Sequence, residues 1–243
     1  MGIINHVLSN DGMISCMAID STDMVAEMLR IHRTTPTCTA ALGRLMTAAS
    51  MMGVGLKNPA HSVTLRVQGG GPAGVLIAVS DGRGYVKAYM GNPDADAPPK
   101  YKGKLDVGAV VGQDGLITVI KDMGLKEPYI GQAALISGEI AEDVAAYYAE
   151  SEQIPTVCGL GVLVEGQKVI SAGGFIAQLM PGANESHINL LEKNTQQLAP
   201  ITTILSTEGI DALIGHLMQV SFGELVVKRG VGGQNPSHSV VEL

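Results

Sequence analysis

The sequence predicts an α+β protein, in which a mixed sheet-and-helix N-terminal body is followed by a helical linker. Short apolar runs recur up to about residue 180, and several are joined by turns rich in Gly, Asn and Asp. Segments with apolar residues at helical spacing lie between these runs. After Pro181-Gly182 the pattern changes to helix signals, which places the linker there.

The body opens with a hairpin and a helix. Ile3–Leu8 and Met13–Ile19 are apolar-rich runs, and the four residues between them have the composition of a tight turn. Ser21 or Thr22 then caps a helix that runs to about Arg33. Four residues of this helix form one stripe and are expected to pack inward: Val25, Met28, Leu29 and His32.

A second, longer helix is predicted from Pro36, because proline is favoured at the first position of a helix. Arg44 is its only charged residue before Lys57, and small residues occupy every side of it. A membrane span would have to place Arg44 and several hydroxyl groups in lipid, which is costly. We therefore expect a helix buried within the protein or at a subunit interface.

The rest of the body alternates between strands and one further helix. Strands are predicted at Ser62–Gln68, Val75–Val79, Tyr85–Met90, Leu116–Ile120, Gln132–Ser137, Val157–Glu165 and Lys168–Leu179. The helix opens at Ser137-Gly138-Glu139 and ends before Pro155. In the linker, Asn184 caps one helical segment and Ile210–Met218 forms another.

Composition excludes some classes of partner. The net charge is −7 and no basic run occurs, which argues against a nucleic acid partner. Charged residues make up only 16% of the chain, so the surface is sparsely charged. Such a surface favours faces of the protein that a partner covers. The 12 methionines fit either an adaptable binding surface or ordinary core packing. No signal peptide is recognisable and the three cysteines form no CxxC, so we expect a cytoplasmic protein.

No motif of the chain predicts catalysis. Gly69–Gly74 matches GxGxxG, but a strand and a turn follow it instead of a helix, and we interpret it as a turn. Glu139, Glu142 and Asp143 fit either acid–base chemistry or the favourable charges of a helix start. No GxSxG occurs. We expect that the protein is not an enzyme, and a small-molecule enzyme that uses the Glu139 region is the third hypothesis.

Four blocks of the chain resemble the heat-shock protein 33 family, the redox-regulated holdase chaperones. They are KGKLDVGAVVGQDGLITVIKDMGLKEPYIGQ (Lys102–Gln132), LISGEIAEDVAAYYAESEQIP (Leu135–Pro155), SAGGFIAQLMPGA (Ser171–Ala183) and HRTTPTCTAALGRLMTAA (His32–Ala49). The resemblance spans roughly Ile3–Leu225 and implies a compact mixed domain, a helical linker and a small C-terminal zinc domain. We accordingly divide the chain into a body at 1–181, a linker at 182–222 and a divergent tail at 223–243.

The resemblance implies a chaperone that binds unfolding client proteins under oxidative or heat stress and prevents their aggregation without ATP. It also implies a homodimer, in which the subunits can exchange elements, and it implicates the linker in client binding. The apolar residues of the linker are Ile188, Leu190, Leu191, Leu198, Ile201, Ile204, Leu205, Ile210, Leu213, Ile214, Leu217 and Met218. They are the predicted client-binding residues.

The cysteines depart from the family pattern. The family's zinc domain carries a CxC and a later CxxC, whereas Cys16, Cys38 and Cys158 lie outside that motif. We therefore expect no cofactor in this chain, neither zinc nor a disulfide switch, and we expect Gly230–Leu243 to be extended or loosely packed. The first hypothesis is a holdase without the redox switch. The alternative is a folded but inactive or regulatory binding protein whose linker hides the client surface.

Overall fold

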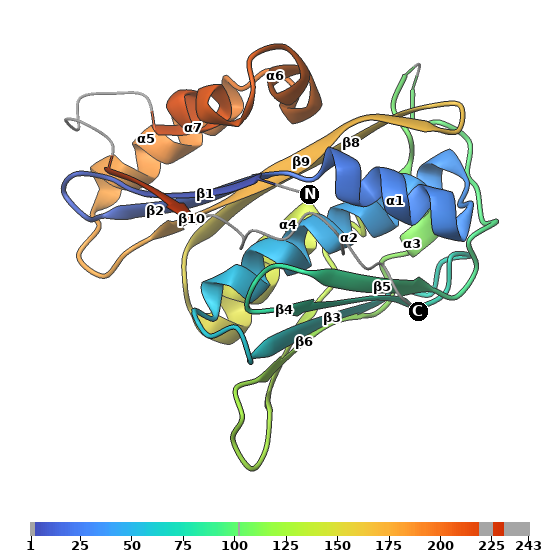
Figure 1. Ribbon diagram of the computed structural model, residues 1–243, viewed down its shortest axis with the longest axis horizontal. Helices are drawn as coiled ribbons and strands as arrows, with labels where there is room; N and C mark the ends of the chain where they lie inside the picture. The colour runs from blue at the N-terminus through green and yellow to red at the C-terminus, as the bar shows by residue number, and fades with distance from the viewer. Residues whose placement is uncertain (1–2, 102, 219–225, 231–243) are drawn as a thin grey trace.

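The computed structural model describes residues 3–101, 103–218 and 226–230. In this part of the chain, two five-stranded antiparallel sheets lie on either side of one long helix, α2 (Pro36–Gly55) (Figure 1). Three further helices from residues 185–218 cover the outer face of one sheet. The predicted α+β class is confirmed.

Sheet A joins the two ends of the described chain. Its strands, in spatial order, are β10 (Val226–Gly230), β1 (Ile3–Leu8), β2 (Ile14–Asp20), β9 (Lys168–Leu179) and β8 (Thr156–Glu165). The predicted hairpin of β1 and β2 is confirmed, and the predicted strands β8 and β9 form a second hairpin. The long β9 also pairs with β2, so it connects the N-terminal hairpin to β8.

Sheet B is formed from the middle of the chain. Its strands, in spatial order, are β5 (Val86–Met90), β4 (Leu76–Asp81), β3 (Ser62–Gln68), β6 (Leu116–Asp122) and β7 (Tyr129–Ala134). β3 has the predicted bounds, but β7 begins and ends three residues before the predicted Gln132–Ser137. The shift has a physical cause, because the amides of Ile136 and Ser137 donate to the Asp143 carboxylate at 2.8 and 3.1 Å.

Helix α2 is buried between the two sheets, as the sequence predicts. Its residues 37–43 and 45–53 are all buried. Small residues allow this close packing: a Cβ on Gly43 would lie 2.7 Å from Val25 Cγ1, and one on Gly53 would lie 2.3 Å from Ser80 Oγ. Real carbon contacts need about 3.5–4.0 Å. The main hydrophobic core therefore surrounds α2 and is lined by the inner faces of both sheets.

Three shorter helical segments complete the body. α1 (Thr22–His32) follows Ser21, whose hydroxyl hydrogen-bonds to Thr47 at 2.7 Å instead of capping the helix. α3 (Val107–Val111) was not predicted; Asp106 caps it by accepting from the amide of Ala109 at 3.1 Å. α4 and a π-helical turn, η1, occupy the region of the predicted helix.

α4 (Ala141–Tyr147) begins later than predicted, and η1 (Tyr148–Glu152) continues it. Asp143 accepts hydrogen bonds from the amides of Gly138 and Ile140, so the chain before α4 wraps around this carboxylate. Ile140 has a φ of 72°, a conformation that β-branched residues rarely adopt. Several hydrogen bonds to one buried carboxylate thus outweigh the preference of this segment for helix.

Candidate client-binding surface

The predicted linker residues lie on helices α5 (Glu185–Gln196), α6 (Ile201–Thr207) and α7 (Ile210–Met218). These helices pack on the face of sheet A that points away from α2 (Figure 1). α6 contacts β8 and β9, and α7 contacts β1 and β2. Asn184 caps α5 as predicted, because its side-chain oxygen accepts from the amide of Ser186 at 3.1 Å.

A second hydrophobic cluster fills the space between these helices and sheet A, and we call it the linker cluster. Its members from the sheet are Val7, Cys16, Ala18, Phe175 and Ala177. Its members from the helices are Leu191, Ile204, Leu205, Leu213, Ile214 and Leu217. Since the linker cluster is separate from the main core around α2, the two can be perturbed independently.

The structure places the twelve predicted client-binding residues mostly against the sheet. Six are buried in the linker cluster, and five others, Leu190, Leu198, Ile201, Ile210 and Met218, are half-buried. Only Ile188 among the twelve is exposed, at 39%. The part of this surface that sheet A contributes was not predicted from the sequence. A signal for it was present in β9, which is apolar on both faces, as expected for a strand whose two faces are both covered by other elements.

Glycines make the sheet smooth where α6 rests on it. A Cβ on Gly159 would lie 2.8 Å from Ile201 Cδ1, and one on Gly161 would lie 2.9 Å from Thr202 Cγ2. A Cβ on Gly173 would lie 2.4 Å from Leu205 Cδ1. All three distances are shorter than a normal carbon contact. These glycines therefore determine how closely the linker approaches the sheet.

Two hydrogen bonds join the linker to the N-terminal hairpin. Asn5 Nδ2 donates to Asp211 Oδ1 at 2.8 Å, which connects β1 to α7. His187 Nδ1 accepts from the amide of Asn184 at 3.1 Å, so its Nε2 carries the proton and donates to Asp11 Oδ2 at 3.0 Å. A hydrogen bond from the Ser9 hydroxyl, with help from the Met13 amide and His187, lowers the pKa of Asp11 to about 2.

The comparisons with known proteins agree with this architecture. The family model described as "Hsp33 protein" matches residues 3–236. The chain belongs to the Hsp33 family. It is therefore a member of a family of holdase chaperones that are not enzymes, and the predictions of family and of a non-enzymatic protein are confirmed.

Members of the Hsp33 family from several bacteria are similar to the chain. A 33 kDa chaperonin of Clostridium botulinum is 46% identical over 200 residues, which cover 82% of this chain and 68% of that protein. The one from Alkaliphilus metalliredigens is 42% identical over 233 residues, or 90% of this chain and 80% of that protein. The crystal structure of the 33 kDa chaperonin of Thermotoga maritima superposes with a TM-score of 0.86 at 31% identity, covering 93% of this chain and 78% of that one.

The three cysteines lie apart from one another in the fold. Cys16 and Cys158 are paired with Ala177 and Ile176 of β9, so they point to opposite faces of sheet A. Cys38 lies in α2, where its thiol donates to the carbonyl of Ala95 at 3.1 Å. Burial raises the pKa of the Cys16 thiol to about 12 and also raises those of Cys38 and Cys158. Within the described residues, no group of three His, Cys, Asp or Glu side chains could hold a metal ion.

Two of the three carboxylates considered for acid–base chemistry, Asp143 and Glu139, have structural roles in this Hsp33 fold. Asp143 is buried and accepts four backbone amides, whereas Glu142 is exposed. Glu139 Oε2 accepts from Arg44 Nη1 at 2.7 Å. Burial works to raise the pKa of Glu139, but the hydrogen bond and charge of Arg44, together with Lys100, outweigh it and lower that pKa. Glu139 therefore acts as the ion-pair partner of Arg44.

The glycine-rich segment Gly69–Gly74 forms a turn, as predicted. The amides of Gly71 and Ala73 donate to the carbonyls of Val111 and Val110 at 3.0 and 2.9 Å, so both are used to hold α3 against the body. β4 follows the segment, and no helix begins there. In the part of the chain that the structure describes, none of the helices is both long and apolar enough to cross a membrane.

Proposed function

We propose that this protein binds unfolding polypeptides through the apolar faces that α5–α7 and sheet A turn toward each other. The linker cluster is the observation that supports this proposal. It gathers apolar residues into one continuous cluster that is separate from the main core. If α5–α7 leave the sheet, both halves of the patch become available while α2 and its core stay packed. Such an area suits a holdase, because apolar binding is non-directional and accepts varied clients.

We further propose that this polypeptide works without a zinc or disulfide switch. Its 243 residues contain three cysteines and no CxxC. Thiol oxidation and metal binding both require the thiolate, and burial keeps the thiol of Cys16 protonated at neutral pH. Release of the linker must then depend on its docking free energy, on heat or on competition by clients.

The alternative function is a binding protein whose linker stays closed. The burial of six of the twelve predicted residues favours it, since a closed linker offers little apolar surface to a client. The two possibilities differ in how often α5–α7 leave the sheet. The homodimer and the cytoplasmic location remain predictions. Analytical sedimentation of the purified protein tests whether it is a homodimer.

The deciding experiment follows the thermal aggregation of an unrelated client by light scattering, with the protein added under reductant or under peroxide. The proposal predicts equal suppression in both conditions. Leu213→Ala, at a fully buried position of the linker cluster, should increase suppression by loosening the linker. Leu125→Ala, at an exposed position in the β6–β7 connection, is the control.

Each negative result has a separate meaning. Suppression by neither wild type nor Leu213→Ala would refute the holdase proposal. Suppression by Leu213→Ala alone would favour the closed-linker alternative. Suppression that appears only with peroxide would refute the absence of a redox switch. Hydrogen exchange of residues 185–218 provides the independent measure of linker opening.

A further inference from the structure

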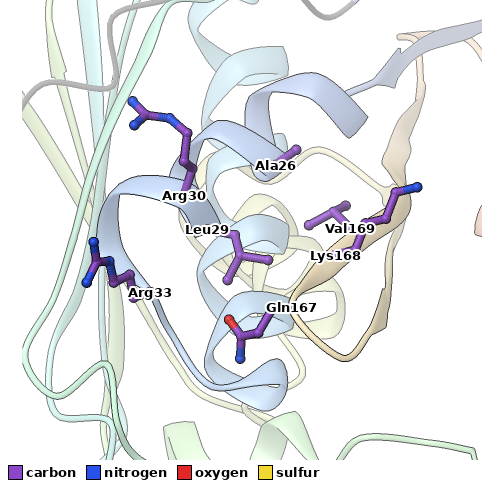
Figure 2. A pocket seen from close by; sticks show the side chains of 7 residues that line it. All are labelled: Ala26, Leu29, Arg30, Arg33, Gln167, Lys168 and Val169. Atoms are coloured by element: carbon purple, nitrogen blue, oxygen red, sulfur yellow. The ribbon is translucent and has the colours of Figure 1, made fainter.

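A groove separate from the linker cluster lies between α1 and the turn that joins β8 to β9 (Figure 2). Its volume is about 480 Å³, and its apolar lining comes from Ala26, Leu29 and Val169. Leu29 and Val169 are each 6% exposed, so they form a floor below a more exposed rim. Ligand clefts commonly have volumes of roughly 300–1,000 Å³.

Cations are concentrated at this groove. Arg30, Arg33 and Lys168 are three of its seven lining residues, and no carboxylate is among the seven. In the whole chain, Lys and Arg are only 16 of 243 residues and the net charge is −7. Arg30 is paired with Glu27 at 2.7 Å, but Arg33 and Lys168 form no ion pair within the described residues. The groove therefore carries positive charge on a predominantly acidic protein.

The charges flank the apolar floor on both sides. Arg30 and Arg33 leave α1 on one side of Leu29, and Lys168 leaves the β8–β9 hairpin on the other side, beyond Val169 (Figure 2). The backbone of Arg33 is fixed at the C-terminal cap of α1. It has a left-handed φ of 51°, and its amide donates to the carbonyl of Leu29 at 2.8 Å. The arrangement matches a segment with an apolar centre and a negative charge at each end.

We propose that this groove binds client segments in which apolar side chains are flanked by Asp or Glu. The proposal rests on the holdase function and names the class of client segment that the body recognises outside the linker cluster. The floor takes up the apolar side chains, and the cations on both rims pair with the carboxylates. Segments flanked by Lys or Arg are repelled. Because the rim is solvated, a single charge contributes little to affinity, and the preference for acidic flanks comes from the three cations acting together. The same charges also increase the rate of association.

Fluorescence anisotropy with two short labelled peptides tests the proposal on the intact protein. Both contain a central Leu-Leu pair, flanked by Glu in one peptide and by Lys in the other. The groove variant combines Arg33→Asn with Lys168→Glu, since Asn tolerates the left-handed backbone. The control combines Lys57→Asn with Lys126→Glu: Lys57 also has a left-handed φ, of 62°, and both lysines are exposed away from the groove.

We expect wild type to prefer the Glu peptide, and the groove variant to bind it about tenfold more weakly, with the loss reduced at high salt. The control variant should bind as wild type does. If both variants lost affinity for the Glu peptide to the same extent, the net charge of the protein and not the groove would determine binding, and the proposal would be overturned. So would an unchanged affinity in the groove variant, or equal binding of both peptides by wild type. Wild type that binds the Glu peptide through the groove but suppresses no aggregation would refute only the holdase function.

Discussion

Gly161→Val is the substitution that most directly tests whether the linker controls access to clients. Gly161 lies in β8 below α6, and a Cβ there would lie 2.9 Å from Thr202 Cγ2. The backbone of Gly161 has no positive φ, so valine fits the strand itself. The added side chain therefore conflicts with the linker helix and not with the sheet.

The magnitude follows from this distance. A carbon contact needs about 3.5–4.0 Å, and forcing extra methyl groups into a packed contact costs about 1–3 kcal/mol. Glycine within a strand is itself unfavourable by roughly 0.5–1 kcal/mol, so valine does not weaken β8. The free energy that docks α5–α7 on sheet A should fall by about 1–3 kcal/mol, which raises the released population by about 5- to 150-fold.

Hydrogen exchange and client aggregation measure the two consequences. In Gly161→Val, residues 185–218 should exchange faster while α2 keeps its protection, and aggregation should be suppressed at a lower protein concentration. Gly215→Ala acts in the opposite direction, because a Cβ on Gly215 in α7 meets no atom within 4 Å and alanine stabilises a helix by roughly 0.5–1 kcal/mol. Faster exchange in Gly161→Val without any gain in suppression would refute the role of the linker cluster in client binding.

Three further predictions concern the body. Asp143→Asn replaces one of the two carboxylate oxygens, which together accept from four backbone amides, with an NH2 group that cannot accept, and should lower stability by about 1.5–3 kcal/mol, a decrease in Tm of roughly 3–12 °C. The exposed Glu142→Gln should stay within about 0.5 kcal/mol. The pKa of Asp11 is lowered from 3.8 to about 2, so its stabilising contribution is complete above pH 3.8 and is lost as the pH falls toward 2. In urea titrations at different pH values, Asp11→Asn should remove the loss of unfolding free energy that wild type shows over this pH range. Cys16 and Cys38 should resist alkylation in the folded protein and react in denaturant, and rapid labelling of either without denaturant would contradict their burial.

Most of the body could be predicted because its signals are local. Strict alternation defines Ser62–Gln68, and turn residues separate the strands of the hairpins. Arg44 is the only charged residue of α2, and this scarcity of charge predicted that the helix is buried, because it has no polar face that suits water. The boundary between β7 and α4 could not be predicted. It depends on Asp143, which draws amides from residues up to seven positions earlier in the chain.

The candidate client surface could likewise be predicted only in part. Composition and spacing identified the apolar residues of the linker, and the resemblance suggested their role. Neither indicated Phe175 and Ala177 as the opposing surface, nor the glycines that let α6 approach it. Similarly, Arg33 and Lys168 are more than 130 residues apart in the chain and meet at one groove only through the packing of α1 beside β9.

The sequence by itself determined most of the strands and helices of this protein, their class and the family to which it belongs, since propensity, turn chemistry and periodicity act over a few residues. The short α3 and the boundary between β7 and α4 are the exceptions in the body. Only the tertiary structure decided which apolar residues face solvent. The burial of Leu213 or Ile204 depends on the sheet that α7 and α6 cover, and that sheet is assembled from both ends of the described chain. Burial is a property of two surfaces together, and the sequence of one segment describes only one of them.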